Sequence, residues 1–369
     1  MTRYRGLTWD HPRGRRPLEQ TAAEWRERGV DVVWDAQPLE GFEAHPIEDL
    51  AARYDLVVLD HPHLGDAVAA GALQPVGHLL GSEAFVGPSV ASYTLGGELW
   101  ALPLDAATQV SARTASRVPV APRTWGEVAS LAEDGGVALS LAGPHALLSL
   151  FSAAAALGHP PVDEPGAPWL DDAGLNGALD LLARVHRAAL PGYAELNPIA
   201  MLERVADRAD PLSYVPLIYG YVTFSRGPDP VTFGDAPRAS ADSPPGSTIG
   251  GTGVAVSART VIDDDLATYL RWLVSDQTQR RVIPVRSGQP ASSAAWRDPL
   301  VDAAASGFYS ATLDTIEHAT VRPRAAGYPA AQQRASAAVR DALDGRITTQ
   351  ALRERLRTET LASVERTRS

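Results

Sequence analysis

Short apolar runs alternate with amphipathic stretches over the first 75 residues of the chain. This pattern predicts strands at residues 5–9, 30–34 and 55–60, separated by helices at residues 17–28 and 47–53. The 55–60 run is continuously apolar between polar ends, as is typical of a strand buried on both faces. The alternation of strands and helices therefore indicates a parallel sheet flanked by helices.

The second part of the chain continues the pattern after a predicted strand at residues 99–104. Thr124 followed by Glu127 predicts a capping box at the start of a helix. The stretch at residues 211–224 is aromatic but holds two prolines, so we expect an edge strand or a loop there. The other expected elements are a strand at residues 137–141, helices from His145 and at residues 171–189, an irregular segment at residues 229–251, a strand at residues 252–257, a helix capped by Asp263, and a last helix from Thr348 that buries Leu352, Leu356, Leu361 and Val364.

The length and charge of the chain narrow the classes of function. A length of 369 residues exceeds what a single core usually supports, so two domains are expected. The 44 acidic against 33 basic residues give a net charge of −11, which argues against a nucleic-acid partner.

Two residue types are missing from the sequence, and their absence excludes several kinds of site. The chain has no cysteine and no lysine. This excludes a thiol nucleophile, cysteine-ligated zinc, a Schiff base and a phosphate-binding loop of the usual lysine type. We therefore expect no cofactor and no metal.

The distribution of apolar residues predicts neither a membrane span nor an export signal. No apolar run reaches 18 residues, so membrane insertion is not expected. The first ten residues contain no apolar core of the length that a secretory signal needs. The sequence as written predicts a cytoplasmic location, and a cell-envelope or extracellular one only if a leader is removed.

Three segments together carry a family resemblance. They are the glycine-rich run GGTGVAVS at residues 250–257, the segment WLVSDQTQR at residues 272–280 and the segment VRPRAAGY at residues 321–328. With the order of the strand–helix units, they resemble the sugar-type solute-binding proteins of ABC importers, which have the type II periplasmic-binding-protein fold.

That resemblance implies two α/β lobes, each a mainly parallel sheet flanked by helices, with the ligand enclosed in a cleft between them. The hinge segments would be residues 102–111 and 250–257. Lobe 1 would comprise residues 1–106 with 250–310, and lobe 2 residues 107–249 with 311–369. The implied function is reversible binding of a small polar solute, sugar-like or another small organic molecule, with an ABC importer permease as a candidate partner.

Polar and aromatic residues follow two of the predicted parallel strands. Trp9, Asp10 and His11 follow the first strand, and Asp60 and His61 follow the 55–60 strand. Ligands bind outside the carboxyl ends of parallel strands, and these side chains offer the hydrogen bonds and flat apolar faces that a polar solute needs. Two alternatives stay open: the aspartates cap the next helical turn, or Asp60, His61 and His63 bind a metal.

Further candidate ligand-binding residues come from later segments of the chain. His145 begins a helix, whose N-terminus favours anionic groups. Arg324, together with Arg322 and Arg286, is a candidate for holding a carboxylate or phosphate. The remaining candidates are Asp105 and Gln109 beside the first crossing, the aromatic Tyr219 and Tyr221, and Gly251 and Thr252 in the glycine-rich run, which lacks the spacing of a dinucleotide-binding loop.

The residues leave the class of function open between three hypotheses. The first is reversible binding without a covalent step. The others are a cytoplasmic enzyme or a ligand sensor built on the same scaffold, because a fold alone does not determine a function. The sequence shows no recognisable nucleophile, set of metal ligands or cofactor-binding loop that would favour the enzyme hypothesis.

Overall fold

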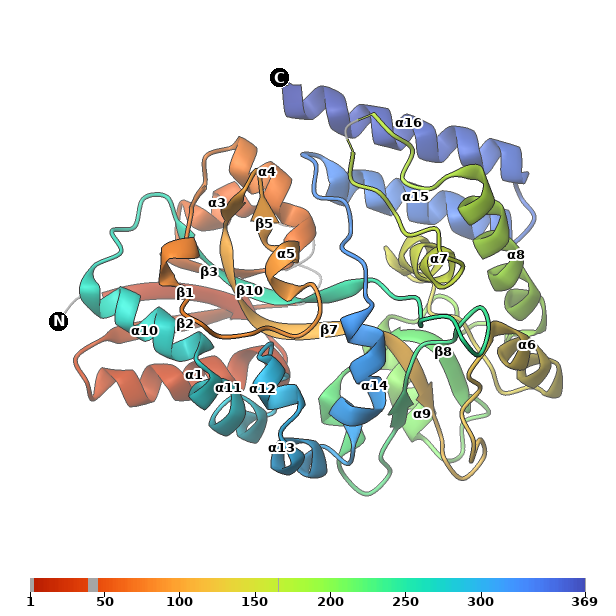
Figure 1. Ribbon diagram of the computed structural model, residues 1–369, viewed down its shortest axis with the longest axis horizontal. Helices are drawn as coiled ribbons and strands as arrows, with labels where there is room; N and C mark the ends of the chain where they lie inside the picture. The colour runs from red at the N-terminus through yellow and green to blue at the C-terminus, as the bar shows by residue number, and fades with distance from the viewer. Residues whose placement is uncertain (1–2, 39–45, 165, 369) are drawn as a thin grey trace. The chain divides into compact units, whose positions relative to one another are not determined.

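The structure is a computed structural model that describes residues 3–38, 46–164 and 166–368, with side chains described as far as residue 361. The chain divides into two compact units (Figure 1). Unit 1 comprises Met1–Ala106 and Gly250–Ala304, and unit 2 comprises Ala107–Ile249 and Ala305–Ser369. The chain therefore passes from one unit to the other after residues 106, 249 and 304.

Unit 1 is built around a sheet whose first three strands are parallel. β1 (Arg3–Trp9) lies between β2 (Asp31–Gln37) and β3 (Leu56–Leu59), with Gly6 opposite Leu56. β10 (Ile249–Ser257) pairs antiparallel with β3 and with the short β4 (Leu73–Gln74). All four residues of β3 are buried, as its continuously apolar sequence predicts.

Helices flank this sheet, and the first of them begins earlier than the sequence predicts. α1 (Pro12–Arg26) starts at Pro12 rather than Pro17, because His11 caps it and a proline is well suited to a first helical position. Asp263 caps α10 as expected, by accepting a hydrogen bond from the Leu266 amide at 2.9 Å. The other helices among the described residues of unit 1 are α3 (Ile47–Ala51), α4 (Leu64–Ala69), α5 (Ser89–Ser92), α10 (Asp264–Val274), α11 (Asp276–Arg281), α12 (Ser293–Trp296) and α13 (Pro299–Ala304). A small hairpin joins β5 (Thr94–Leu95) to β6 (Glu98–Leu99).

The described ladders of unit 2 are antiparallel. β7 (Ala101–Arg113) enters this unit after residue 106 and pairs with β8 (Tyr214–Tyr219) and β9 (Thr232–Gly234). The register between β7 and β8 shifts beside Pro216, which has no amide hydrogen to donate to the ladder. The predicted strand at residues 137–141 is wrong in extent, because only a parallel bridge from Val137 to Tyr214 forms there.

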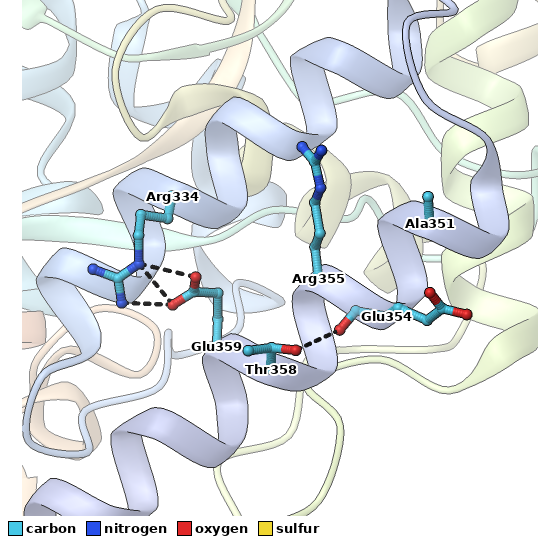
Figure 2. A pocket seen from close by; sticks show the side chains of 6 residues that line it. All are labelled: Arg334, Ala351, Glu354, Arg355, Thr358 and Glu359. Atoms are coloured by element: carbon cyan, nitrogen blue, oxygen red, sulfur yellow. Dashed lines mark hydrogen bonds and ion pairs between the residues drawn. The ribbon is translucent and has the colours of Figure 1, made fainter.

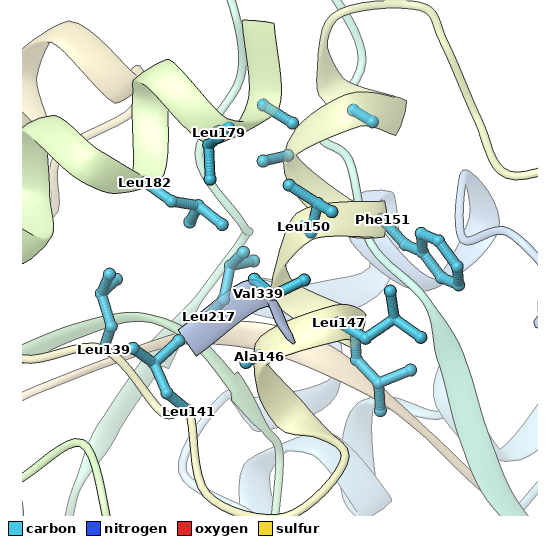
Figure 3. Close-up of a cluster of buried hydrophobic side chains, with 14 of the residues drawn as sticks. Leu139, Leu141, Ala146, Leu147, Leu150, Phe151, Leu179, Leu182, Leu217 and Val339 are labelled. Atoms are coloured by element: carbon cyan, nitrogen blue, oxygen red, sulfur yellow. The ribbon is translucent and has the colours of Figure 1, made fainter. Parts of the chain in front are cut away.

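The core of unit 2 surrounds α7 (His145–Ala156), which is apolar on nearly every side. Its Leu150 shares one buried cluster with Leu179 and Leu182 of α8 (Asp172–Ala188), and Leu147 and Phe151 extend the cluster on another side of α7 (Figure 3). The other helices of the unit are α6 (Trp125–Asp134), α9 (Pro198–Ala206), α14 (Phe308–Glu317), α15 (Tyr328–Leu343) and α16 (Thr349–Arg368). Burying this much apolar surface is the main source of the unit's stability.

The last helix follows its predicted pattern only in part. Leu352 and Leu356 of α16 are buried against the cluster, but Leu361 is 48% exposed. The side chain of Val364, which the sequence also predicts to be buried, lies outside the described residues. No helix in the described part of the chain is both long and apolar enough to span a bilayer.

Candidate functional site

The five candidates that follow β1 and β3 gather at one edge of the sheet in unit 1. The two strands are parallel neighbours, so their carboxyl ends point the same way. Trp9 ends β1, with Asp10 and His11 next, and Asp60 and His61 come directly after β3. The sequence therefore identified a set of side chains that the fold does bring together.

Trp9 and His11 form a stacked pair at the start of α1. The centres of the two rings are 5.0 Å apart and their planes are within 5° of parallel. The Arg13 guanidinium carbon lies 5.9 Å from the centre of the indole ring. Gly14 permits this packing, because a Cβ there would come within 2.1 Å of the indole Nε1. Burial, reinforced by the charges of Arg13 and Arg16, lowers the pKa of His11 to about 4. The imidazole is thus neutral at physiological pH.

Asp105 forms a buried ion pair with Arg13, a residue that the sequence analysis missed. The Arg13 Nε donates to Asp105 Oδ2 at 2.7 Å, and a second guanidinium nitrogen donates to Oδ1. Burial raises the pKa of the Asp105 carboxyl, an effect that the charge of Arg13 and a backbone hydrogen bond from Gln289 oppose. The pair fixes the first turn of α1 beside β7, and no local pattern in the sequence indicated it.

Asp60 and His61 occupy the turn after β3. Asp60 caps a single 3-10 turn by accepting the His61 amide at 2.9 Å, which was one of the alternatives left open by the sequence. The His61 ring is completely buried and meets the edge of Tyr93, with 6.2 Å between ring centres. Asp10 is different, because it is exposed and lies 3.1 Å from Arg15.

The metal alternative finds no support in this turn. Across the described residues, no group of three or more acidic or histidine side chains is placed to hold a metal ion.

The glycine-rich start of β10 has a structural role at Gly251. This residue has a φ of +101°, and a Cβ on it would lie 2.3 Å from the Asp105 carbonyl oxygen. Only glycine permits both the backbone conformation and the close approach to β7. Thr252 beside it is buried.

A second group of candidates lies in unit 2, where His145 begins α7. Its side chain is 8% exposed, and its ring meets Tyr219 at the end of β8 with 5.8 Å between ring centres. The Tyr219 hydroxyl lies 3.3 Å from the Thr248 Oγ1. Burial, followed by the charge of Arg322, lowers the pKa of His145 to about 4. Arg322, which is 3% exposed, is therefore part of the same surroundings.

Gln109 is buried within a network of side-chain hydrogen bonds in unit 2. Its amide oxygen accepts from the Ser152 hydroxyl at 2.7 Å and its amide nitrogen donates to the Ser149 hydroxyl at 3.3 Å, both on α7. The Ser247 hydroxyl donates to the Gln109 carbonyl oxygen at 2.6 Å. These bonds hold α7 against β7. Nothing in the sequence around the three serines indicated this role.

The two remaining candidates in unit 2 lie in separate segments. Tyr221 is buried and precedes the 3-10 turn at Val222–Ser225. Arg324 forms an ion pair with Asp163, with 3.3 Å between Nε and Oδ2, and its backbone amide also donates to that carboxylate. Asp163 thus orients the Arg324 guanidinium. Arg322, two residues earlier in the sequence, lies close to His145 instead.

A surface pocket in unit 2 contains none of the predicted residues. It lies between α15 and α16 and is lined by Arg334, Ala351, Glu354, Arg355, Thr358 and Glu359 (Figure 2). Arg334 and Glu359 bind each other across it at 2.6 Å. These two charges therefore neutralise each other.

Comparison with known proteins identifies the fold. Maltose-bound MalE3 of T. maritima is 17% identical with a TM-score of 0.77, over 97% of this chain and 98% of that one. The GacH receptor of Streptomyces glaucescens, solved unliganded and with acarbose, is 15% identical with a TM-score of 0.80, over 98% of both chains. A solute-binding protein of Agrobacterium radiobacter in complex with ribitol is 19% identical with a TM-score of 0.76, over 98% of both chains.

These similarities extend over nearly the whole chain. No protein-family model matches the sequence, and no curated protein matches it either. The chain nevertheless has the two-lobed α/β fold of the solute-binding proteins of ABC transporters, so the fold that the sequence predicts is confirmed.

Proposed function

We propose that this protein reversibly binds a small polar solute of the sugar or polyol class, in the manner of an ABC-importer solute-binding protein. The observation that carries the proposal is the fold, shared over 97% or more of the chain with proteins solved with maltose and ribitol. The tryptophan, aspartate and histidine side chains at the edge of the unit 1 sheet support it, because such groups suit a polyhydroxylated ligand.

Candidate ligand contacts are proposed in each unit. In unit 1 they centre on Asp60 and on the stacked Trp9 and His11, and in unit 2 on His145 and Tyr219. Carboxylates accept hydrogen bonds from sugar hydroxyls, and aromatic faces pack on their C–H surfaces. The full proposed set is Trp9, Asp10, His11, Asp60, His61, Asp105, Gln109, His145, Tyr219, Tyr221, Gly251, Thr252 and Arg324.

Asp60→Asn tests the contribution of the unit 1 edge. Asparagine keeps the capping acceptor of the turn but removes the charge, so folding should be little affected. We expect calorimetry to show that at least one of maltose, ribitol, mannitol and tagatose binds the wild-type protein. Asp60→Asn should weaken the binding of that ligand about tenfold, which corresponds to about 1.4 kcal/mol. The matched control is Asp49→Asn, since Asp49 is an exposed carboxylate on α3, which precedes β3.

Two results would contradict this proposal. One is that no sugar or polyol binds the folded protein. The other is that a bound solute is recovered chemically altered after incubation, which would favour the enzyme hypothesis instead. Equal weakening by Asp60→Asn and Asp49→Asn would remove Asp60 from the site.

The proposal implies a partner in transport. An importer permease is the protein to which a solute-binding protein delivers its ligand, and we propose it as a partner here. Fractionation of the host cell tests this part, because delivery from outside requires the protein in the envelope or extracellular fraction. A wholly cytoplasmic protein would fit the predicted location and favour a ligand sensor.

A further inference from the structure

We infer that the solute carries an anionic group, a carboxylate or a phosphate, and that this group binds in unit 2 to His145 and Arg322 at the start of α7. The inference rests on the proposed function, because it specifies which class of polar solute is bound. Three observations within unit 2 support it, and all concern the surroundings of one buried imidazole.

The first observation is the unsatisfied imidazole. His145 is more than nine-tenths buried, yet its Nδ1 has no hydrogen-bond partner among the described residues. Buried polar atoms in folded proteins nearly always have a partner, and those that lack one need an explanation. A ligand oxygen would supply the missing bond to this nitrogen.

The second observation is the sign of the nearby charge. Arg322 is buried, and it is the charged group that acts on His145. A guanidinium offers a planar set of donors that fits a carboxylate or a phosphate with two hydrogen bonds.

The third observation is the helix that His145 begins. α7 is twelve residues long and has no acidic residue in its first turn. Its amino end therefore presents a positive partial charge that its own side chains leave uncompensated. The buried guanidinium and the helix amino end both favour a negatively charged ligand, and the neutral imidazole can donate one hydrogen bond to it.

Matched pairs of sugars test the inference on the whole protein. Galacturonate is compared with galactose, and glucose 6-phosphate with glucose, by calorimetry at pH 7. We expect at least one anionic member to bind ten or more times more tightly than its neutral counterpart. Arg322→Gln should abolish that preference while changing the Kd of the neutral sugar less than threefold.

A second variant and a control separate binding from folding. His145→Asn should also reduce the preference for the anion, and Arg187→Gln, which removes an exposed arginine of α8, should leave it unchanged. If Arg322→Gln does not fold, the preference of the wild-type protein and the effect of His145→Asn still decide the outcome.

The outcomes distinguish this inference from the proposed function. Binding of a neutral sugar or polyol without any preference for its anionic counterpart would overturn the anionic subsite and leave the proposed function intact. Failure of the neutral and the anionic compounds alike to bind would contradict both.

Discussion

Two histidines in this protein show how burial sets the chemistry of single residues. His11 and His145 lie in different units, yet the pKa of each is lowered to about 4, first by burial and then by nearby arginines. Neither ring is positively charged at neutral pH, so both offer a neutral donor and acceptor to a ligand. Such tuning cannot be recognised in the sequence, where both are simply histidines beside a proline.

The lowered pKa of His145 predicts a pH-dependent stability. In the unfolded chain its pKa returns to about 6.5, so between pH 6.5 and pH 4 the unfolded state binds more protons than the folded state. The free energy of unfolding therefore falls as the pH drops through this window, and the contribution at pH 5 is about 2 kcal/mol. At pH 7 the imidazole is mostly neutral in both states, so its contribution there is small.

His145→Asn should remove this part of the pH dependence. The free energy of unfolding is measured with denaturant at pH 7 and at pH 5. We expect its decrease between these two pH values to be about 2 kcal/mol smaller in the variant than in the wild type. His78→Asn, at an exposed histidine of unit 1, is the control and should behave as the wild type does. Identical losses in all three proteins would show that His145 is protonated as easily in the folded state as in the unfolded state.

The spatial groupings of candidate residues that the sequence did and did not predict differ in a physical way. Trp9, His11, Asp60 and His61 were predicted because residues after parallel strands face one edge of the sheet. The link from Arg13 to Asp105 was not, because it joins residues 92 positions apart and depends on where α1 begins. Pairings over that distance leave no local pattern in the chain.

At the level of elements, local signals were reliable where the backbone itself requires them. The Thr124 capping box forms as predicted, with the Thr124 Oγ1 accepting the Glu127 amide at 3.3 Å and the Glu127 carboxylate accepting the Thr124 amide at 3.1 Å. Of the strand predicted at residues 137–141 only a bridge at Val137 forms, although all five residues are buried and all but Ser140 are apolar. Burial alone does not decide whether a segment pairs as a strand.

Gly251 of β10 provides a sharp test at the scale of one element. Alanine at this position would adopt an unfavourable φ of +101° and place its Cβ 2.3 Å from the Asp105 carbonyl oxygen. Gly29 has a similar φ of +96°, but nothing lies within 4 Å of its Cβ position. The two glycines therefore separate the cost of backbone strain from that of a collision.

We expect Gly29→Ala to reduce the free energy of unfolding by about 1 to 2 kcal/mol, the cost of strain alone. Gly251→Ala should reduce it by at least about 2 kcal/mol more, because β7 and β10 must move apart to admit the methyl group. Chemical denaturation of both variants is the measurement. Equal losses would mean that the approach of the two strands is easily relaxed.

The chain passes between the two units three times, so the units are not joined by a single linker. Each unit is assembled from segments that lie far apart in the sequence, since unit 1 combines Met1–Ala106 with Gly250–Ala304. Composition and periodicity predicted the α/β class, but only the order of several weak motifs indicated the solute-binding-protein fold. At 15–19% identity the structural likeness still extends over 97% or more of the chain.

The proposed reversible binding predicts how the stability of the whole protein responds to its solute. A ligand that binds only the folded state adds RT ln(1 + [L]/Kd) to the free energy of unfolding, which is roughly 2.7 kcal/mol at one hundred times Kd. The melting temperature should therefore keep rising with each tenfold increase in solute above Kd, by about 1.4 kcal/mol of stabilisation per step. Thermal melts over four decades of concentration, with a non-binding sugar as control, measure this. A stabilisation that levels off at one equivalent, or a solute recovered altered after the melt, would show that binding is not a simple reversible equilibrium.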